Sequence, residues 1–299
     1  MEKKPLVVVN GLVRKDAIAY LKEHVDVRQW TEKTVMPREV LKEWLVDADG
    51  LWCVRPLDVD ADLVKNAPNL KVIAQAAVGY DNVNIDELTA AGIPYGNTPG
   101  VLNETVAELA FTLIATASRR IIENANFVKD GRWAQRPSNI KGFDLSRRTL
   151  GIIGMGAIGV SISRRARAFG MTVVYHNRNQ RLDDKIHKTT YMELDDLLAT
   201  SDVVCVMAPL TDETYHMCDE AFFKKMKNTA LFVNVGRGPI VDTEALINAL
   251  NTGEIDYAAL DVTDPEPLPV DHPLLEVENC LIVPHIGSYT DRTRYDKIG

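Results

Sequence analysis

The stretch TLGIIGMGAIG, residues 149–159, decides the fold of this chain. Its apolar start has the composition of a buried β-strand, and a helical pattern follows the glycines. The spacing of Gly154, Gly156 and Gly159 suits three needs: a tight turn, a close approach of backbone to a phosphate, and close packing of helix on strand. A second apolar strand, 172–175, ends about 20 residues beyond the first glycine, as a dinucleotide-binding turn requires. We therefore predict such a turn rather than an incidental Gly-rich loop.

The expected phosphate-binding segment is this turn and the start of the helix after it. Free backbone N–H groups at a helix start attract anions. The residues assigned to the site on this basis are Gly154, Met155, Gly156, Ala157, Ile158 and Gly159.

Strands and helices alternate around the turn. The predicted strands are 149–153, 172–175, 203–207, 230–235, 257–260 and 281–283. The predicted helices between them are 157–169, 193–198, 219–226 and 242–251. Nearly continuous apolar strands are typical of a parallel sheet covered on both faces, and six strands are the number in a doubly wound dinucleotide-binding sheet.

The first third of the chain shows a similar alternation and predicts a second α/β layered domain. Its predicted strands are 6–9, 50–54, 71–77 and 93–96, and its predicted helices are 15–23, 38–46, 60–66 and 85–91. One long helix is expected over 103–129. The polar segment 131–146 that follows has the composition of a crossing between domains.

Size and charge agree with two soluble domains. The 299 residues carry 34 basic and 42 acidic side chains, a net charge of −8. An acidic chain without a basic block is a poor candidate for binding nucleic acid or an anionic membrane. The four cysteines form no Cys-x-x-Cys pair, so we expect a cytoplasmic protein without a metal site.

Three polar turns follow predicted strands, at the ends where open parallel sheets bind ligands. They are NVGRG (234–238), DVTDPEP (261–267) and PHIGS (284–288). An arginine fork can hold a carboxylate and polarise a keto oxygen, and a histidine can donate a proton to that oxygen. A carboxylate beside the histidine stabilises its protonated form. Together, these groups are suited to the reduction of a 2-keto acid.

With these turns in place, the chain resembles the D-isomer-specific 2-hydroxyacid dehydrogenase family, and most of all its glyoxylate/hydroxypyruvate reductase branch. The resemblance spans nearly the whole chain, in the order and spacing of the family. The matching stretches are AAVGYDNVN (76–84), TPGVLNETVAELAFTLI (98–114), TLGIIGMGAIG (149–159), APLTDET (208–214), NVGRGPIVD (234–242), DVTDPEP (261–267) and PHIGS (284–288).

The resemblance implies an α/β protein with two doubly wound parallel-sheet domains. A Rossmann cofactor domain, 100–285, is expected to be inserted into a flavodoxin-like substrate domain made of 1–99 and 286–299, with the site in the cleft between them. The helix that begins at Asn103 is expected to cross between the domains and to help build a twofold homodimer.

The resemblance also implies individual roles. Arg237 is expected to bind the substrate, Glu266 to pair with the histidine, and His285 to be the acid/base. Val78 and Gly79 are expected to bind the substrate carboxylate through their N–H groups. Independently of the resemblance, Arg55 follows the predicted strand 50–54 and is a candidate for binding a second anionic group. The remaining expected cofactor contacts are Thr105, Pro209, Thr214, Val235, Gly236, Asp261 and Gly287.

The end of the second strand of the cofactor domain predicts which dinucleotide binds. NAD enzymes usually carry an acid there for the ribose 2′-hydroxyl. This chain has Asn177 and Arg178 instead, and the first acid is Asp183. An amide and a guanidinium can donate hydrogen bonds to a 2′-phosphate, and Arg181 adds charge at the rim. We therefore expect NADP to be preferred, with NAD as the alternative.

Two alternatives to a 2-keto acid reductase stay open at this point. Transcriptional corepressors that share this fold retain the three catalytic residue types, so those residues do not exclude a nucleotide-sensing scaffold. An enzyme of the phosphoglycerate dehydrogenase type would use Arg55 for its second anion, although the chain has no room for the regulatory domain common in that branch.

Overall fold

The computed structural model describes residues 3–296, which form two compact units. One unit runs up to Leu102 and includes the segment from Thr290 onward, and the other is Asn103–Tyr289. These boundaries lie within four residues of the domains expected from the resemblance. The polar segment 131–146 lies inside the second unit, so the crossing that its composition suggested is not there.

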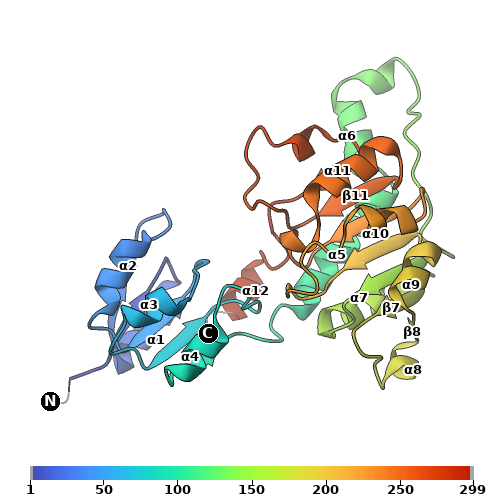
Figure 1. Cartoon of the computed structure of the whole chain (residues 1–299). Helices are drawn as coiled ribbons and strands as arrows, with labels where there is room; N and C mark the ends of the chain where they lie inside the picture. The colour runs from blue at the N-terminus through green and yellow to red at the C-terminus, as the bar shows by residue number, and fades with distance from the viewer. Residues whose placement is uncertain (1–2, 297–299) are drawn as a thin grey trace. The chain divides into compact units, whose positions relative to one another are not determined.

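The first unit contains a parallel sheet with five strands among the residues described, in the order β2-β1-β3-β4-β5 (Figure 1). This is the flavodoxin-like 2-1-3-4-5 order. Its elements are β1 (Leu6–Val9), α1 (Lys15–His24), β2 (Asp26–Gln29), α2 (Arg38–Leu45), β3 (Gly50–Cys53), α3 (Ala61–Lys65), β4 (Val72–Gln75), α4 (Ile85–Ala90), β5 (Tyr95–Gly96) and, after the second unit, α12 (Asp291–Asp296).

The second unit opens with α5 (Asn103–Ser118), α6 (Ile121–Lys129) and η1 (Arg132–Ala134). Its sheet elements are β6 (Thr149–Ile153), α7 (Ala157–Ala168), β7 (Thr172–His176), α8 (Asp184–His187), β8 (Thr190–Tyr191), α9 (Leu194–Thr200), β9 (Val203–Val206), α10 (Glu220–Lys225), β10 (Leu231–Asn234), η2 (Gly238–Ile240), α11 (Thr243–Thr252), β11 (Tyr257–Leu260), η3 (Pro273–Glu276) and β12 (Cys280–Ile282).

All seven strands described in the second unit are parallel, in the order β12-β11-β10-β9-β6-β7-β8. Counted from β6 in chain order, the sequence is 3-2-1-4-5-6 with β12 added at the far edge, which is the Rossmann order. The predicted fold class is therefore confirmed in both units. The predicted count of six strands is wrong by one, because the short edge strand β8 was not expected.

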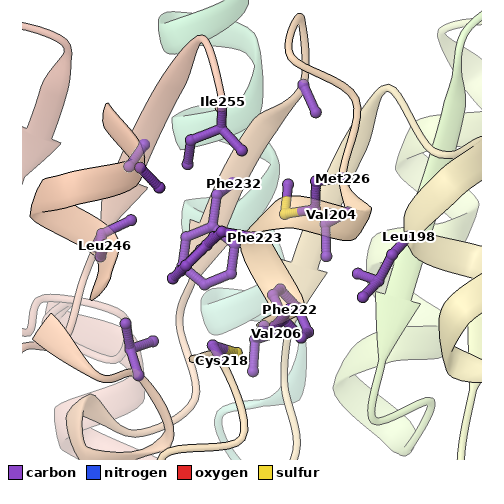
Figure 2. Close-up of a cluster of buried hydrophobic side chains, with 14 of the residues drawn as sticks. Leu198, Val204, Val206, Cys218, Phe222, Phe223, Met226, Phe232, Leu246 and Ile255 are labelled. Atoms are coloured by element: carbon purple, nitrogen blue, oxygen red, sulfur yellow. The ribbon is translucent and has the colours of Figure 1, made fainter. Parts of the chain in front are cut away.

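The sheet of the second unit is buried on both faces, as nearly continuous apolar strands require. Alternate residues of a strand point to opposite faces. On β10, Phe232 packs with α9, α10 and α11, whereas Leu231 and Val233 pack with α5 and α7 on the other face. Figure 2 shows the first cluster, where the rings of Phe232 and Phe223 lie 5.2 Å apart in an edge-to-face arrangement.

The long helix predicted over 103–129 is interrupted. α5 ends at Ser118 and α6 starts at Ile121, because Arg120 has left-handed backbone dihedrals with φ of 49°. One contact distant in sequence and one local contact involve its side chain: the Arg120 guanidinium lies 4.4 Å from the ring centroid of Tyr257, and its Nε donates to Glu123 at 2.6 Å. Among residues 3–296, every helix is too short or too polar to span a lipid bilayer.

Candidate active site

The glycine turn after β6 has the shape that a dinucleotide requires. Gly154 has φ of +98°, and a Cβ there would lie 2.5 Å from the backbone nitrogen of Ala208. A Cβ on Gly159 would lie 3.0 Å from the Gly154 oxygen, so the helix packs closely on the turn. A Cβ on Gly156 would meet nothing within 4 Å, so the space beside it is open. The residues present therefore fit a pyrophosphate at the start of α7.

The turns at the carboxyl ends of the central strands lie against one another. A Cβ on Gly236, after β10, would lie 3.1 Å from the Ala208 oxygen, after β9. A Cβ on Gly238 would lie 1.8 Å from the Thr263 oxygen, which no side chain could accommodate. Glycine at 238 therefore lets the arginine turn and the acidic turn after β11 come together.

Asp261 links the turn after β11 to the turn after β12. Its side chain is buried, and its two carboxylate oxygens accept the N–H groups of Ile286 at 2.7 Å and Gly287 at 2.9 Å. The His285 N–H donates to the Asp261 carbonyl at 2.9 Å. Burial raises the pKa of Asp261, while the hydrogen bonds from Ile286 and Gly287 oppose that rise. Asp261 thus fixes the backbone on both sides of the histidine side chain.

His285 and Glu266 form a hydrogen-bonded pair. The Nδ1 atom of His285 lies 2.6 Å from Oε1 of Glu266, and the two side chains are 48% and 40% exposed. His285 has φ of 51°, an uncommon conformation for a residue with a side chain, so the turn holds it at some conformational cost. Because Nδ1 faces Glu266, Nε2 is the ring nitrogen that can serve a substrate.

The pair favours a proton on His285. The hydrogen bond with Glu266 raises the pKa of His285; burial lowers it, and the negative charges of Glu266 and Asp261 raise it further. Burial raises the pKa of Glu266, but the hydrogen bond and charge of His285 outweigh that effect and the pKa is lowered overall. The shifts agree in direction: each partner stabilises the charged form of the other.

The arginine turn is built around Asn234, a buried residue for which no role was predicted. Its Oδ1 accepts the Gly236 N–H at 3.0 Å, and its Nδ2 donates to the Arg237 carbonyl at 2.9 Å. Arg237 is half-buried, and its Nη1 donates to the Gly236 carbonyl at 2.9 Å. The positive charge of Arg237 acts on the pKa of both His285 and Glu266, so the three predicted catalytic side chains share one site. An asparagine beside a glycine turn is the local signal that could have identified this support.

Further predicted cofactor contacts lie on the same edge. The Thr214 hydroxyl donates to the Pro209 carbonyl at 2.7 Å and shapes the loop after β9. Val235 is buried in the arginine turn. Thr105 is in the first turn of α5, and its neighbour Val106 lies 3.5 Å from the position of a Cβ on Gly287. The helix start thereby approaches the histidine turn.

The loop after β7 contacts the glycine turn. Asn177 accepts the Met155 N–H through Oδ1 at 2.6 Å. Arg178 is exposed. The pKa of Glu213 is lowered, mainly by a hydrogen bond from Thr211 and more weakly by the charge of Arg178, so Arg178 lies toward the loop after β9.

The predicted substrate residues of the first unit also share a sheet edge. Val78 and Gly79 follow β4, and their carbonyls accept hydrogen bonds from Asn97 and Gln75, both at 2.9 Å. Arg55 follows the neighbouring strand β3, where Asn10 accepts its N–H at 3.1 Å. Because β1 and β3 flank the switch point of this sheet, Arg55 lies where such folds bind ligands. Within residues 3–296, no group of three or more His, Cys, Asp or Glu side chains is arranged to hold a metal ion.

Comparison with known proteins identifies the family to which this fold belongs. Residues 111–287 match the family model of the D-isomer specific 2-hydroxyacid dehydrogenase NAD binding domain. A glyoxylate reductase of Korarchaeum cryptofilum is 42% identical over 97% of this chain and 89% of its own length. Glyoxylate/hydroxypyruvate reductase B of Escherichia coli is 42% identical over 98% of this chain and 91% of its own. Among solved structures, the NADPH-dependent glyoxylate/hydroxypyruvate reductase of Sinorhizobium meliloti, in complex with NADP and malonate, superimposes with a TM-score of 0.87 at 29% identity, over 99% of this chain and 91% of that one.

Proposed function

The chain belongs to the D-isomer-specific 2-hydroxyacid dehydrogenase family, and we propose that this enzyme reduces a small 2-keto acid, glyoxylate or hydroxypyruvate, to the 2-hydroxy acid, with D configuration where the product is chiral. The observation that carries the proposal is the 2.6 Å contact between His285 and Glu266 beside the turn of Arg237. Relatives of about 40% identity over nearly the whole chain are named for these two substrates.

The site residues divide the chemistry among them. The nicotinamide, when bound, supplies a hydride to the keto carbon. Arg237 binds the substrate carboxylate and polarises the keto oxygen with its planar fork. His285 donates the proton from Nε2 to that oxygen, and Glu266 orients the ring through Nδ1 and stabilises the protonated form. In the oxidative direction, neutral His285 takes the proton back.

The first unit contributes the remaining substrate contacts in this proposal. The N–H groups of Val78 and Gly79 bind the substrate carboxylate. The hydrogen bonds from Asn97 and Gln75 to the carbonyls of these two residues hold the loop backbone in place for that role. Arg55 is the candidate for a second polar group, such as the hydroxymethyl of hydroxypyruvate.

We propose NADPH as the preferred reductant. The first acidic residue after β7 is Asp183, seven residues beyond the end of the strand. Its carboxylate oxygens accept hydrogen bonds from Arg181 at 2.7 and 2.6 Å. It therefore does not offer the ribose 2′-hydroxyl the open acceptor typical of NAD enzymes. Exposed Arg178 supplies positive charge for a 2′-phosphate. The Sinorhizobium meliloti relative is NADPH-dependent, which supports the same choice.

We also propose a homodimer formed through α6 and the turn after it. Ile121 and Val128, seven residues apart on one helical face, are each 50% exposed, and Trp133 is 66% exposed. Apolar side chains gathered in this way are typical of a covered surface, and a second copy of the chain is the partner we expect. Light scattering should give twice the mass of one chain, and V128E/W133E should give the mass of a monomer. A wild-type mass of one chain would refute the dimer.

The activity is tested by mixing the purified chain with glyoxylate or hydroxypyruvate and NADPH, and following oxidation of the nicotinamide. We expect turnover with at least one of the two acids and formation of the D enantiomer of glycerate from hydroxypyruvate. A folded protein that binds NADPH but reduces neither acid would instead favour a nucleotide-sensing scaffold.

A further inference from the structure

Side chains of the loop after β7 form hydrogen bonds with the backbone of the glycine turn at one residue, Met155. Met155 lies between Gly154 and Gly156, so its peptide groups belong to the turn that faces the pyrophosphate. Its N–H donates to Asn177 Oδ1 at 2.6 Å. Its carbonyl accepts from Asn177 Nδ2 at 3.3 Å and from Arg181 Nη1 at 3.0 Å. Both backbone polar groups of Met155 are therefore held by side chains of a single loop.

Arg181 is itself fixed at several points. Its Nε and Nη2 donate to the two carboxylate oxygens of Asp183, at 2.7 and 2.6 Å. Its backbone N–H donates to the hydroxyl of Tyr175, a fully buried side chain, at 2.8 Å. Asp183 also lies 3.0 Å from Nε2 of His187. All three nitrogens of the guanidinium thus have partners within the protein, and its charge is compensated by a carboxylate.

Arg178 is in a different situation three residues earlier. Its side chain is exposed, and within residues 3–296 no hydrogen bond joins it to a carboxylate. A 2′-phosphate could bind Arg178 without displacing a protein partner. To bind Arg181 in the same way, the phosphate would have to compete with the two bonds to Asp183.

We infer that Asn177 and Arg181, with Asp183 holding Arg181, are positioning residues that lock the Met155 peptide for the pyrophosphate shared by both nicotinamide dinucleotides, and that Arg178 is the arginine that recognises the 2′-phosphate. The inference rests on the proposed use of such a dinucleotide. It revises the expectation that Asn177 and Arg181 act mainly on the 2′-phosphate.

A positioning role and a phosphate-binding role differ in what they do to two ligands. Loss of one hydrogen bond to Met155 weakens binding of any dinucleotide, by about 3–10-fold, the usual range for a single hydrogen bond. Loss of a charge-assisted bond from the exposed Arg178 to the 2′-phosphate weakens only the phosphorylated ligand, by about 3–10-fold once screening by solvent and salt is included.

The test measures binding of ADP-ribose and of 2′-phospho-ADP-ribose by calorimetry. Neither probe carries a nicotinamide, so binding is separated from turnover. We expect Arg181→Met and Asp183→Asn to weaken both probes by the same factor, and Arg178→Met to weaken only the phosphorylated probe. Lys185→Met, which removes an exposed charge from α8, serves as the control and should change neither.

Three outcomes would overturn the inference: Arg181→Met weakening only the phosphorylated probe, Asp183→Asn strengthening that probe by releasing Arg181, or both variants binding as the wild type does. Circular dichroism establishes that each variant is folded, and Asp183→Asn keeps the side-chain volume. If the wild type binds both probes equally, the proposed NADPH preference fails, while a common loss in Arg181→Met still supports the lock. If the wild type binds neither probe, the proposed cofactor fails and the lock fails with it.

Discussion

The two ends of the cofactor-binding edge are built differently. At the His285 end, turns after three adjacent strands pack against one another, and buried Asp261 and Asn234 hold their backbones. At the Arg178 end, a single loop after β7 is held mainly by the half-buried ion pair of Arg181 and Asp183, whose side chains are 27% and 35% exposed, and Arg178 itself lies at the surface. A reacting group must be placed accurately, whereas a charged rim needs only a favourable field. We therefore expect substitutions to cost most at the first end and least at the second.

His285→Ala should produce the largest effect. Removal of the proton donor should lower kcat for reduction by about 10²–10⁴, the usual contribution of a general acid. Cofactor affinity should change little, because the imidazole addresses the substrate. Steady-state kinetics with glyoxylate and hydroxypyruvate measures the loss, and His24→Ala, on the exposed face of α1, is the matched control. A folded His285→Ala enzyme with most of its turnover would show that the proton comes from elsewhere.

Arg237→Lys comes next, at about 10–100-fold in kcat/KM, since lysine keeps the charge but loses the planar fork. The loss should appear in KM and in kcat, because the guanidinium serves binding and polarisation together. Arg136→Lys, on an exposed side chain, controls for the exchange itself. Unchanged kcat/KM for both acids would refute the role of Arg237. It would also show that the His285 end tolerates substitution as well as the Arg178 end does.

The sequence predicted the central parts of this fold better than its edges. Interior strands such as β9 and β10 are buried throughout, so their composition was clear. β2 reads DVRQ and β8 has two residues; both lie at sheet edges, where exposure permits polar or very short strands. The break at Arg120 was not predictable locally, because its ring contact is with Tyr257, far along the chain.

The same contrast holds for the site. His285, Glu266 and Arg237 were expected together because each lies in a turn with its own motif, and the structure places them at one edge. The support given by Asn234 and the Arg181–Asp183 pair was not expected, because it depends on which atoms a side chain reaches. The type of a residue in a motif predicts which reaction it can serve. The hydrogen bonds that hold such a residue in place can be identified only from the distances between atoms in the folded structure.

Glu266→Gln tests the electrostatic coupling at the catalytic end. Glu266 raises the pKa of His285, so the wild type keeps its proton, and its reductase activity, to higher pH. Without the negative charge the pKa of His285 falls, and the descending limb of the reductase profile should move to lower pH, so the variant loses reductase activity first on that limb. Oxidation of the hydroxy acid needs neutral His285, so its ascending limb should move to lower pH as well. Rate profiles in both directions measure this, and profiles superimposable on those of the wild type would show that Glu266 is not coupled to His285.

Arg178→Ala should have the smallest effect on catalysis, and this effect should be the one that differs most between NADPH and NADH. Arg178 is exposed, so its interaction with a 2′-phosphate is partly screened by solvent and salt. We expect kcat/KM with NADPH to fall by about 3–10-fold, with NADH nearly unchanged, so the preference shrinks while the chemistry persists. Titration of each cofactor at fixed glyoxylate measures the ratio, and raising the ionic strength should narrow the difference between wild type and variant. An equal loss with both cofactors would place Arg178 among the groups that hold the glycine turn. The Arg178 end would then resemble the His285 end, where substitutions affect catalysis whichever cofactor is used.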